Sequence, residues 1–257
     1  MLKKIKNFIK KKGTTPIVCL TAYSKNISKI LDNYCDAILV GDSLANVLYG
    51  MTNTHKISLE MMINHACSVK QGVKKSLLIV DMPKGTYTNN KNAKKNANKI
   101  INITKCDAVK IESNNKNFSI IEYLVKSGLP VMGHIGYTPQ YKKTFTVAGK
   151  SYEEEKKLIK EAKKIEKAGA FSIVLECVSK QVSKKITQSI NIPTIGIGSS
   201  VECDGQILVT DDILGLSNFN PKFVKKYINL NKLIEKSVQK YKKEVKNKLF
   251  PKKINSY

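Results

Sequence analysis

The chain has 257 residues, of which 42% are hydrophobic, and this length and composition suit a globular protein with one sizeable core. No apolar run approaches the roughly 20 residues of a membrane-spanning helix. The lysine-rich residues 1–12 are not followed by the apolar segment of a secretory signal. These features predict a soluble cytoplasmic protein without a membrane partner.

The formal net charge is +25, and a charge this positive is typical of proteins that bind nucleic acids. However, all 45 basic residues are lysines, and arginine is the favoured reader of guanine and the usual bidentate phosphate ligand. The lysines are scattered, often beside asparagine and isoleucine, as expected from codon drift in an AT-rich genome. We therefore predict a solvated lysine surface and no specific nucleic-acid partner.

We expect any binding to DNA or RNA to be weak, independent of sequence and lost steeply as salt rises, because contacts with phosphates release condensed counterions. Fluorescence anisotropy with several unrelated oligonucleotides, at low and at physiological salt, measures this. Tight binding of one sequence at physiological salt would contradict it.

Cysteine and histidine give no sign of a zinc site or of disulfides. The six cysteines stand singly, without a CxxC pair, which in a cytoplasmic chain is typical of buried thiols. His55 and His65 lie in polar surroundings without HExxH spacing.

Apolar segments with the length of buried strands alternate with amphipathic segments along the chain. In Asp36–Ser43, residues 37–40 are apolar, as in a strand that is buried on both faces, and Gly41, Asp42 and Ser43 follow at its end. Eight strands are predicted near Ile17–Tyr23, Asp36–Ser43, Ser76–Pro83, Asp107–Glu112, Pro130–Gly136, Phe171–Cys177, Pro193–Gly198 and Gln206–Val209.

Helices are predicted between most of these strands, and Ser24 and Ser58 are suited to cap two of them. Tyr137–Ser151 has no clear period, so we predict a long loop of the kind that forms a lid or a binding loop. Predicted helices cover residues 3–12, 24–33, 58–71, 89–104, 118–127, 153–168, 180–189 and 223–246.

Strand followed by helix, repeated eight times without a domain break, predicts an α/β fold, a TIM (β/α)8 barrel. We predict one domain over residues 1–257, with a short N-terminal helix, a lysine-rich helical C-terminal extension and Asp204–Gly205 as a turn before the last strand. No GxGxxG follows the first strand and no GxxxxGK[ST] occurs, so dinucleotide-binding and P-loop folds are disfavoured.

Acidic residues recur where the predicted strands end: Asp42, Asp81, Glu112 and Glu176, with His134 on a further strand. Independent helix caps would not need to be acidic on strand after strand. The carboxyl ends of parallel strands in a barrel meet at one face, which is where such barrels carry their active sites. We therefore predict one shared site, in which His134 either orients a ligand or supports a loop.

Side chains alternate along a strand, so Lys110 and Glu112 share one face while Val109 and Ile111 share the other. The apolar pair is expected to face the outer helices, which leaves Lys110 and Glu112 in the barrel mouth. The same counting turns Glu176 inward.

Asp42 and Asp81 end neighbouring strands and should lie about 5 Å apart. Two carboxylates at that separation repel each other unless a cation lies between them, and oxygen-only ligands suit Mg²⁺. Two plainer interpretations stay open: Asp42 caps the following turn, or the carboxylates take part in salt bridges.

Seven segments taken together resemble one known family, in order and nearly without gaps from about Thr14 to Asn229. They are Ile38–Ser43, Val80–Pro83, Val109–Glu112, Val131–Gln140, Ile173–Val178, Ile195–Gly198 and Cys203–Val209. Their residues are similar to those of the ketopantoate hydroxymethyltransferase (3-methyl-2-oxobutanoate hydroxymethyltransferase) family. Any one of them alone would be a weak signal.

The resemblance implies a barrel of the phosphoenolpyruvate/pyruvate type in a homo-oligomer, which the family suggests is a decamer. It implies transfer of a hydroxymethyl group from 5,10-methylenetetrahydrofolate to 3-methyl-2-oxobutanoate in pantothenate and coenzyme A biosynthesis. The product is 2-dehydropantoate (ketopantoate), formed through a Mg-stabilised enolate with one Mg²⁺ per subunit.

The resemblance also implies roles for individual residues, and the chemistry requires such groups because a carbon acid beside a ketone must lose a proton to a base. The matched positions are Asp42, Asp81 and Glu112 for the metal, Asp42, Ser43, Asp81 and Lys110 for the 2-oxo acid, and Glu176 for the general base.

Two other functions compete with this one. Another enolate-forming barrel lyase, such as the isocitrate lyase group, carries a Cys-Lys-Gly-Cys-His loop that this chain lacks. A lysine-rich nucleic-acid-binding protein on an inactive barrel would be favoured by missing acids, and all the candidate acids are present.

Overall fold

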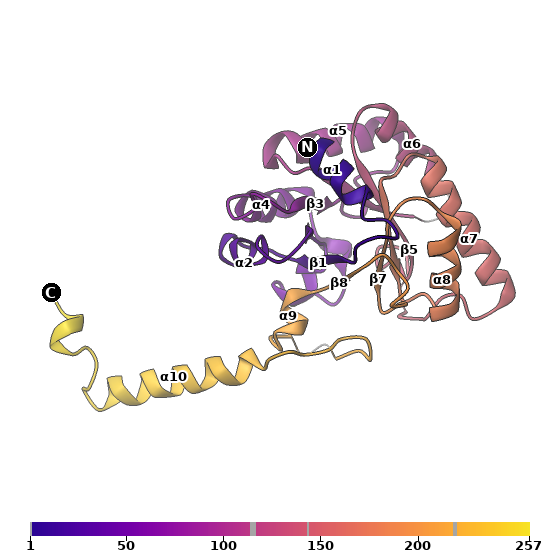
Figure 1. Cartoon of the computed structure of the whole chain (residues 1–257). Helices are drawn as coiled ribbons and strands as arrows, with labels where there is room; N and C mark the ends of the chain where they lie inside the picture. Colours follow the sequence, from indigo (N-terminus) through magenta and orange to yellow (C-terminus); the bar gives the residue numbers. More distant parts are fainter. Residues whose placement is uncertain (1, 114–116, 143, 218–219) are drawn as a thin grey trace. The chain divides into compact units, whose positions relative to one another are not determined.

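Parallel strands close into a barrel in the computed structural model, which describes residues 2–113, 117–142, 144–217 and 220–257 (Figure 1). Within these residues each strand pairs with the next in the chain, and the eighth strand pairs with the first, so the predicted TIM barrel is confirmed. The strands are β1 Ile17–Thr21, β2 Ala37–Val40, β3 Leu77–Asp81, β4 Ala108–Glu112, β5 Val131–Gly136, β6 Ser172–Glu176, β7 Thr194–Ile197 and β8 Gly205–Leu208.

The alternation of side chains along each strand produces two cores. Val109 and Ile111 of β4 belong to the outer core, which the barrel shares with the surrounding helices. Ala108 of β4 and Met132 of β5 belong to the smaller core inside the barrel. The predicted orientation of β4 is therefore confirmed, with Lys110 and Glu112 on the inward face.

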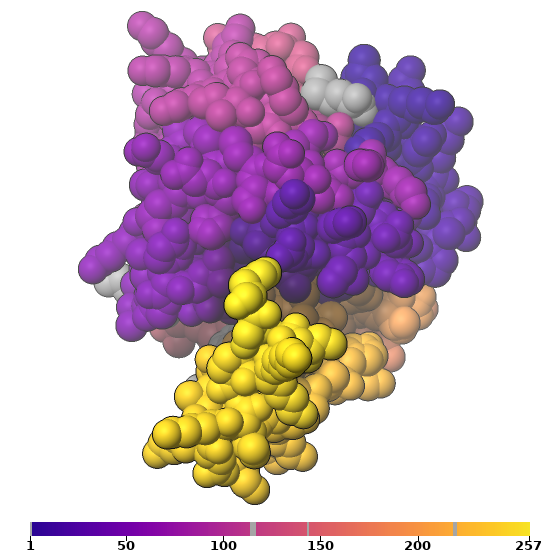
Figure 2. Space-filling model, turned by 90° about the vertical axis from the view of Figure 1, so that its left-hand side faces the viewer, coloured from indigo at the N-terminus to yellow at the C-terminus, as the bar shows by residue number. Residues whose placement is uncertain are grey.

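Most helices surround the barrel, as Figure 1 shows. Figure 2 views the side that carries α2 and α4, where residues of the N-terminal half form a continuous surface. Ser58 accepts a hydrogen bond from the backbone N–H of Met61 and so caps α4 as predicted. Ser24 precedes α2, but its side chain makes no capping bond. The helices are α1 Leu2–Ile9, α2 Lys25–Leu31, α3 Leu44–Val47, α4 Leu59–Lys70, α5 Asn90–Thr104, α6 Phe118–Lys126, α7 Tyr152–Lys167, α8 Lys180–Ser189, α9 Thr210–Ile213 and α10 Leu230–Lys246, with short 3₁₀ turns at Thr54–Lys56 and Lys253–Asn255.

The N-terminal helix α1 closes the end of the barrel at which the strands begin. Ile5 and Phe8 are buried and belong to the core inside the barrel. The ring of Phe8 meets that of Phe171, just before β6, edge to face with 5.8 Å between centroids. The polar residues lie at the opposite end of the barrel, where the strands finish.

The predicted strand–helix alternation is wrong between β7 and β8. Residues 198–204, all of them described, connect these strands without a helix. The predicted turn at Gly205 is also wrong, because Gly205 begins β8 and pairs with both Ile17 and Ile195. A Cβ atom at Gly205 would lie 2.5 Å from the carbonyl oxygen of Ile17, so this glycine permits close strand pairing.

The chain divides into two compact units, residues 1–209 and 210–257. The first holds the barrel, and the second holds α9 and the lysine-rich α10. Helix α10 begins at Leu230 instead of the predicted residue 223, because the backbone N–H groups of Tyr227 and Leu230 bond to the α9 segment, at Ile213 and Leu214. That both units form a single domain stays a prediction. No helix among the described residues combines the length and apolar character needed to cross a membrane.

Candidate active site

The predicted acids come together where the strands end. Asp81 of β3 pairs in register with Lys110 of β4, and Glu112 of β4 pairs with His134 of β5. Glu176 is the last residue of β6, three strands on from Asp81. Most of these side chains are buried, whereas Glu176 keeps 16% of its side chain exposed.

Asp42, Asp81 and Lys110 form the first half of the site. The backbone N–H of Asp42, just beyond β2, donates to Asp81 Oδ2 at 3.0 Å. Lys110 Nζ lies 2.8 Å from Asp81 Oδ1. The two aspartates are therefore adjacent, as the sequence predicted, and one buried ammonium group already neutralises part of their charge.

His134 connects this half of the site to Glu176. Its Nδ1 lies 3.4 Å from Lys110 Nζ and its Nε2 lies 3.2 Å from Glu176 Oε2. Lysine can only donate, so Nδ1 accepts and the imidazole proton lies on Nε2, facing Glu176. Within the described residues, the Nε2 contact is not aligned as a hydrogen bond.

Gln140, in the loop after β5, holds two of the acids and was absent from the predicted site. Its side-chain Nε2 donates to Asp42 Oδ2 at 2.9 Å, and its backbone N–H donates to Glu112 Oε2 at 3.0 Å. Its Oε1 accepts a hydrogen bond of 2.5 Å from the hydroxyl of Tyr87. Periodicity could not reveal Gln140, because loops have none.

Ser43 is less buried than Asp42, Asp81 and Glu112. Its hydroxyl is 2.8 Å from that of Tyr23, which follows β1 closely in the chain. The hydroxyl of Ser43 is thus held by a residue that follows the neighbouring strand β1.

Burial, together with the nearness of other carboxyl groups, raises the pKa values of three acids in the site. Burial, reinforced by the negative charge of Asp81, raises the pKa of Asp42 to about 7. Burial also raises the pKa of Glu176 to about 8, against the opposing charge of Lys110. The pKa of Glu112 is raised well above its usual value by burial and by Asp42. Such perturbed groups at the end of a barrel are typical of a catalytic site.

The pKa values of the two basic groups of the site, Lys110 and His134, shift in opposite directions. Burial alone would lower the pKa of Lys110, but Asp81, Glu112 and Asp42 outweigh burial and raise it, so Lys110 stays charged. Burial and the positive charge of Lys110 hold the pKa of His134 well below 6.5. His134 is therefore neutral at neutral pH and faces Glu176 as a dipole.

The donor set of Asp42 and Asp81 fits a hard divalent cation. Both groups offer only oxygen, and their mutual repulsion, seen in the raised pKa of Asp42, would be relieved by a cation. No group of three His, Cys, Asp or Glu side chains in the described part of the chain is arranged to hold a metal. Two carboxylates with water and substrate oxygens are nevertheless a common Mg²⁺ site, and Glu112 as a further metal ligand stays a prediction.

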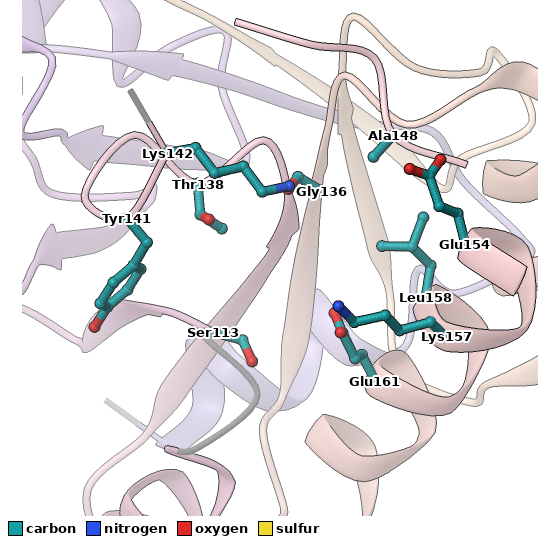
Figure 3. Close-up of a pocket in the computed structure, with 10 residues that line it drawn as sticks. All are labelled: Ser113, Gly136, Thr138, Tyr141, Lys142, Ala148, Glu154, Lys157, Leu158 and Glu161. Atoms are coloured by element: carbon teal, nitrogen blue, oxygen red, sulfur yellow. The ribbon is translucent and has the colours of Figure 1, made fainter. Parts of the chain in front are cut away.

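A cavity of about 250 Å³ lies between the loop after β5 and α7 (Figure 3). Thr138, Tyr141 and Lys142 line it from the loop, while Glu154 and Lys157 reach it from α7. None of the predicted site residues lines it. The predicted loop 137–151 borders this cavity, and its role as a lid or a binding loop stays a prediction. Lys143 within it lies outside the described residues.

Comparison with known proteins identifies the family. The family model for ketopantoate hydroxymethyltransferase matches residues 2–253. The chain is 53% identical to a 3-methyl-2-oxobutanoate hydroxymethyltransferase of Pelagibacter ubique, and the alignment covers 100% of both chains. It is 48% identical to the enzyme of that name from Rhizobium rhizogenes, over 93% of this chain and 90% of the relative.

The chain belongs to the ketopantoate hydroxymethyltransferase family. It is therefore an enzyme, a transferase of the pantothenate pathway, and the family predicted from the strand-end motifs is confirmed.

Solved structures of other enzymes share the barrel fold, among them a member of the phosphoenolpyruvate mutase/isocitrate lyase superfamily. A 2,3-dimethylmalate lyase aligns with a TM-score of 0.63 and 13% identity, over 95% of this chain and 86% of the other. Phosphoenolpyruvate phosphomutase from Streptomyces platensis subsp. rosaceus aligns with a TM-score of 0.64 and 12% identity, over 95% and 87% of the two chains. Identities this low show the shared fold alone.

Proposed function

We propose that the protein transfers the one-carbon unit of 5,10-methylenetetrahydrofolate to C3 of 3-methyl-2-oxobutanoate, with Glu176 as the general base. The observation that carries the proposal is the position of Glu176, partly exposed at the barrel mouth and facing the acids that Lys110 and Gln140 hold. Family membership supports the overall transfer.

The substrate is a 2-oxo acid with a negative carboxylate, which needs a positive partner in this acidic site. Lys110 is the buried cation that can neutralise it, and the Ser43 hydroxyl can donate a hydrogen bond to it. Asp42 and Asp81 would hold Mg²⁺, which would supply Lewis-acid polarisation of the ketone.

Glu176 then takes the proton from C3, and the electron pair of that C–H bond forms the enolate. A pKa of about 8 suits a base near neutral pH, since it is high enough to accept a proton and low enough to be partly ionised. Neutral His134, whose Nε2 lies 3.2 Å from Glu176, faces this carboxylate without neutralising it. The nucleophilic C3 then attacks the methylene carbon of the folate, and one C–N bond of that methylene bridge breaks as its nitrogen takes a proton. Water then displaces the second folate nitrogen from the same carbon and that nitrogen takes the remaining proton, which gives the hydroxymethyl group of ketopantoate and releases tetrahydrofolate.

Several parts of this function stay predictions. They are the use of one Mg²⁺ per subunit, the folate co-substrate, assembly into a homo-oligomer such as a decamer, and a cytoplasmic location. Incubation of the purified protein with Mg²⁺, the 2-oxo acid and methylenetetrahydrofolate tests the central proposal. Ketopantoate is the expected product, and no product at any folate concentration would rule the proposal out.

We expect Asp42→Asn and Asp81→Asn each to weaken Mg²⁺ binding by more than about 10-fold, since even partners outside the ligand shell typically contribute that much. Calorimetric titration with Mg²⁺ measures the affinity, and circular dichroism checks that the fold is kept. Glu202→Gln, at a half-exposed surface position, is the control. Unchanged Mg²⁺ affinity in both aspartate variants would contradict the metal site.

A further inference from the structure

Gln140 joins the ends of three neighbouring strands through one side chain and one peptide group. Its Nε2 donates to Asp42 Oδ2 after β2 and to the carbonyl oxygen of Met82 after β3, the second at 3.0 Å. Its backbone N–H donates to Glu112 at the end of β4. Gln140 is 1% exposed, so solvent does not compete for these bonds.

Asp42, Met82 and Tyr87 together determine which way the amide of Gln140 points. Both hydrogens of Nε2 are used, on Asp42 and on Met82, while Oε1 accepts the hydroxyl of Tyr87 at 2.5 Å. Reversing the amide would set Oε1 against a carboxylate and a carbonyl, both acceptors, and would leave buried groups unpaired. The Tyr87 hydroxyl therefore favours the single orientation in which Gln140 donates to Asp42.

In this arrangement Gln140 bonds to one particular oxygen of each of the two carboxylates. Gln140 engages Oδ2 of Asp42 and leaves Oδ1 out of the bond, and it engages Oε2 of Glu112. Since the amide is neutral, it orients the carboxylates without cancelling the charge that would attract a cation. A lysine at this position would cancel that charge.

We propose that Gln140, held by Tyr87, is a positioning residue that orients the carboxylates of Asp42 and Glu112 for Mg²⁺ and the 2-oxo acid. The role of Mg²⁺ in this inference rests on the proposed function. Neither Gln140 nor Tyr87 takes part in the proton transfer.

Two variants test the inference in a calorimetric titration with Mg²⁺ alone. Gln140→Met keeps the length of the side chain and the backbone bond to Glu112 but removes the amide, and it should weaken Mg²⁺ binding by about 10–100-fold. Tyr87→Phe removes only the hydroxyl that holds Oε1, so a loss of about 3–10-fold is expected, as for one neutral hydrogen bond.

The two effects should be coupled, because Tyr87 acts through Gln140. In the Gln140→Met background, Tyr87→Phe should change the Mg²⁺ affinity by less than about 2-fold. The concentration of Mg²⁺ that gives half of the maximal activity should rise in parallel with the dissociation constant. For Tyr87→Phe, saturating Mg²⁺ should restore kcat, since the reacting groups are intact. A merely structural role would lower thermal stability and leave that half-activating concentration unchanged.

Ser28→Ala is the matched control, because Ser28 is buried on α2 and its hydroxyl donates to the carbonyl oxygen of Val69 at 2.9 Å, outside the acid cluster. It should leave Mg²⁺ affinity unchanged. If Tyr87→Phe has the same effect with and without Gln140, or if neither variant changes Mg²⁺ affinity, the positioning role is overturned.

These experiments distinguish failure of the positioning role from failure of the proposed function. Coupled losses of Mg²⁺ affinity in a protein that makes no ketopantoate would support the positioning role and overturn the reaction. Ketopantoate formation with unshifted Mg²⁺ affinity in both variants would support the reaction and overturn the positioning role. A wild-type protein that binds no Mg²⁺ would overturn the positioning role directly.

Discussion

Replacement of Glu176 by Gln is expected to lower turnover by about 10²–10⁴-fold, the usual effect of removing a general base. Exchange of the C3 hydrogen of 3-methyl-2-oxobutanoate with solvent deuterium should be lost to the same extent, because exchange requires the same proton transfer. Proton NMR in D₂O with Mg²⁺ and without folate measures the exchange. The amide keeps the shape of the side chain, so binding of Mg²⁺ and of the 2-oxo acid should be retained.

The pH dependence gives a second measurement of this role. The pKa of Glu176 is raised to about 8, and a base acts when deprotonated, so kcat/KM should increase as pH rises towards about 8. Glu176→Gln should lose this ascending limb. Glu122→Gln, which changes an exposed glutamate on α6, is the control and should leave rate and profile unchanged. Wild-type exchange rates in Glu176→Gln would exclude Glu176, and Glu112 would then be the next candidate for the base.

The positions of the acids could be predicted because strands have a fixed period of two. Lys110 and Glu112 had to share a face once Val109 and Ile111 were assigned to the outer core, and that face proved to be the barrel interior. The closed order of parallel strands then determined that Glu176 lies three strands from Asp81.

The contacts made by loops could not be predicted in the same way. Gln140 lies in a segment without periodicity, so nothing in the sequence indicates that its amide reaches back to Asp42 over 98 residues. Gly205 was interpreted as a turn because glycine favours turns, yet here it permits close pairing with β1. In both cases a tertiary contact outweighs the local signal.

Replacement of Lys110 by Met is expected to lower the free energy of unfolding by about 3–5 kcal/mol, as is typical when one partner of a buried ion pair is removed. Lys110 is buried and lies 2.8 Å from Asp81, and its charge also opposes the raised pKa values of Asp42 and Glu112. Urea unfolding, followed by circular dichroism, measures the loss. Lys126→Met removes a lysine whose side chain is 75% exposed and should cost less than about 1 kcal/mol.

The loss in Lys110→Met should also depend on pH, in a direction that follows from the raised pKa values. A carboxyl group whose pKa is higher in the folded state destabilises the fold increasingly as pH rises from about 4, its unfolded value, up to its folded value. The folded values are about 7 for Asp42 and about 8 for Glu176, and loss of the lysine charge should raise both further. The variant should therefore be destabilised more at about pH 8, where the wild-type acids ionise beside Lys110, than at about pH 5, where most stay protonated. Equal losses at the two pH values would show that Lys110 contributes through packing and its pair with Asp81 alone, and not by stabilising the whole group of acids.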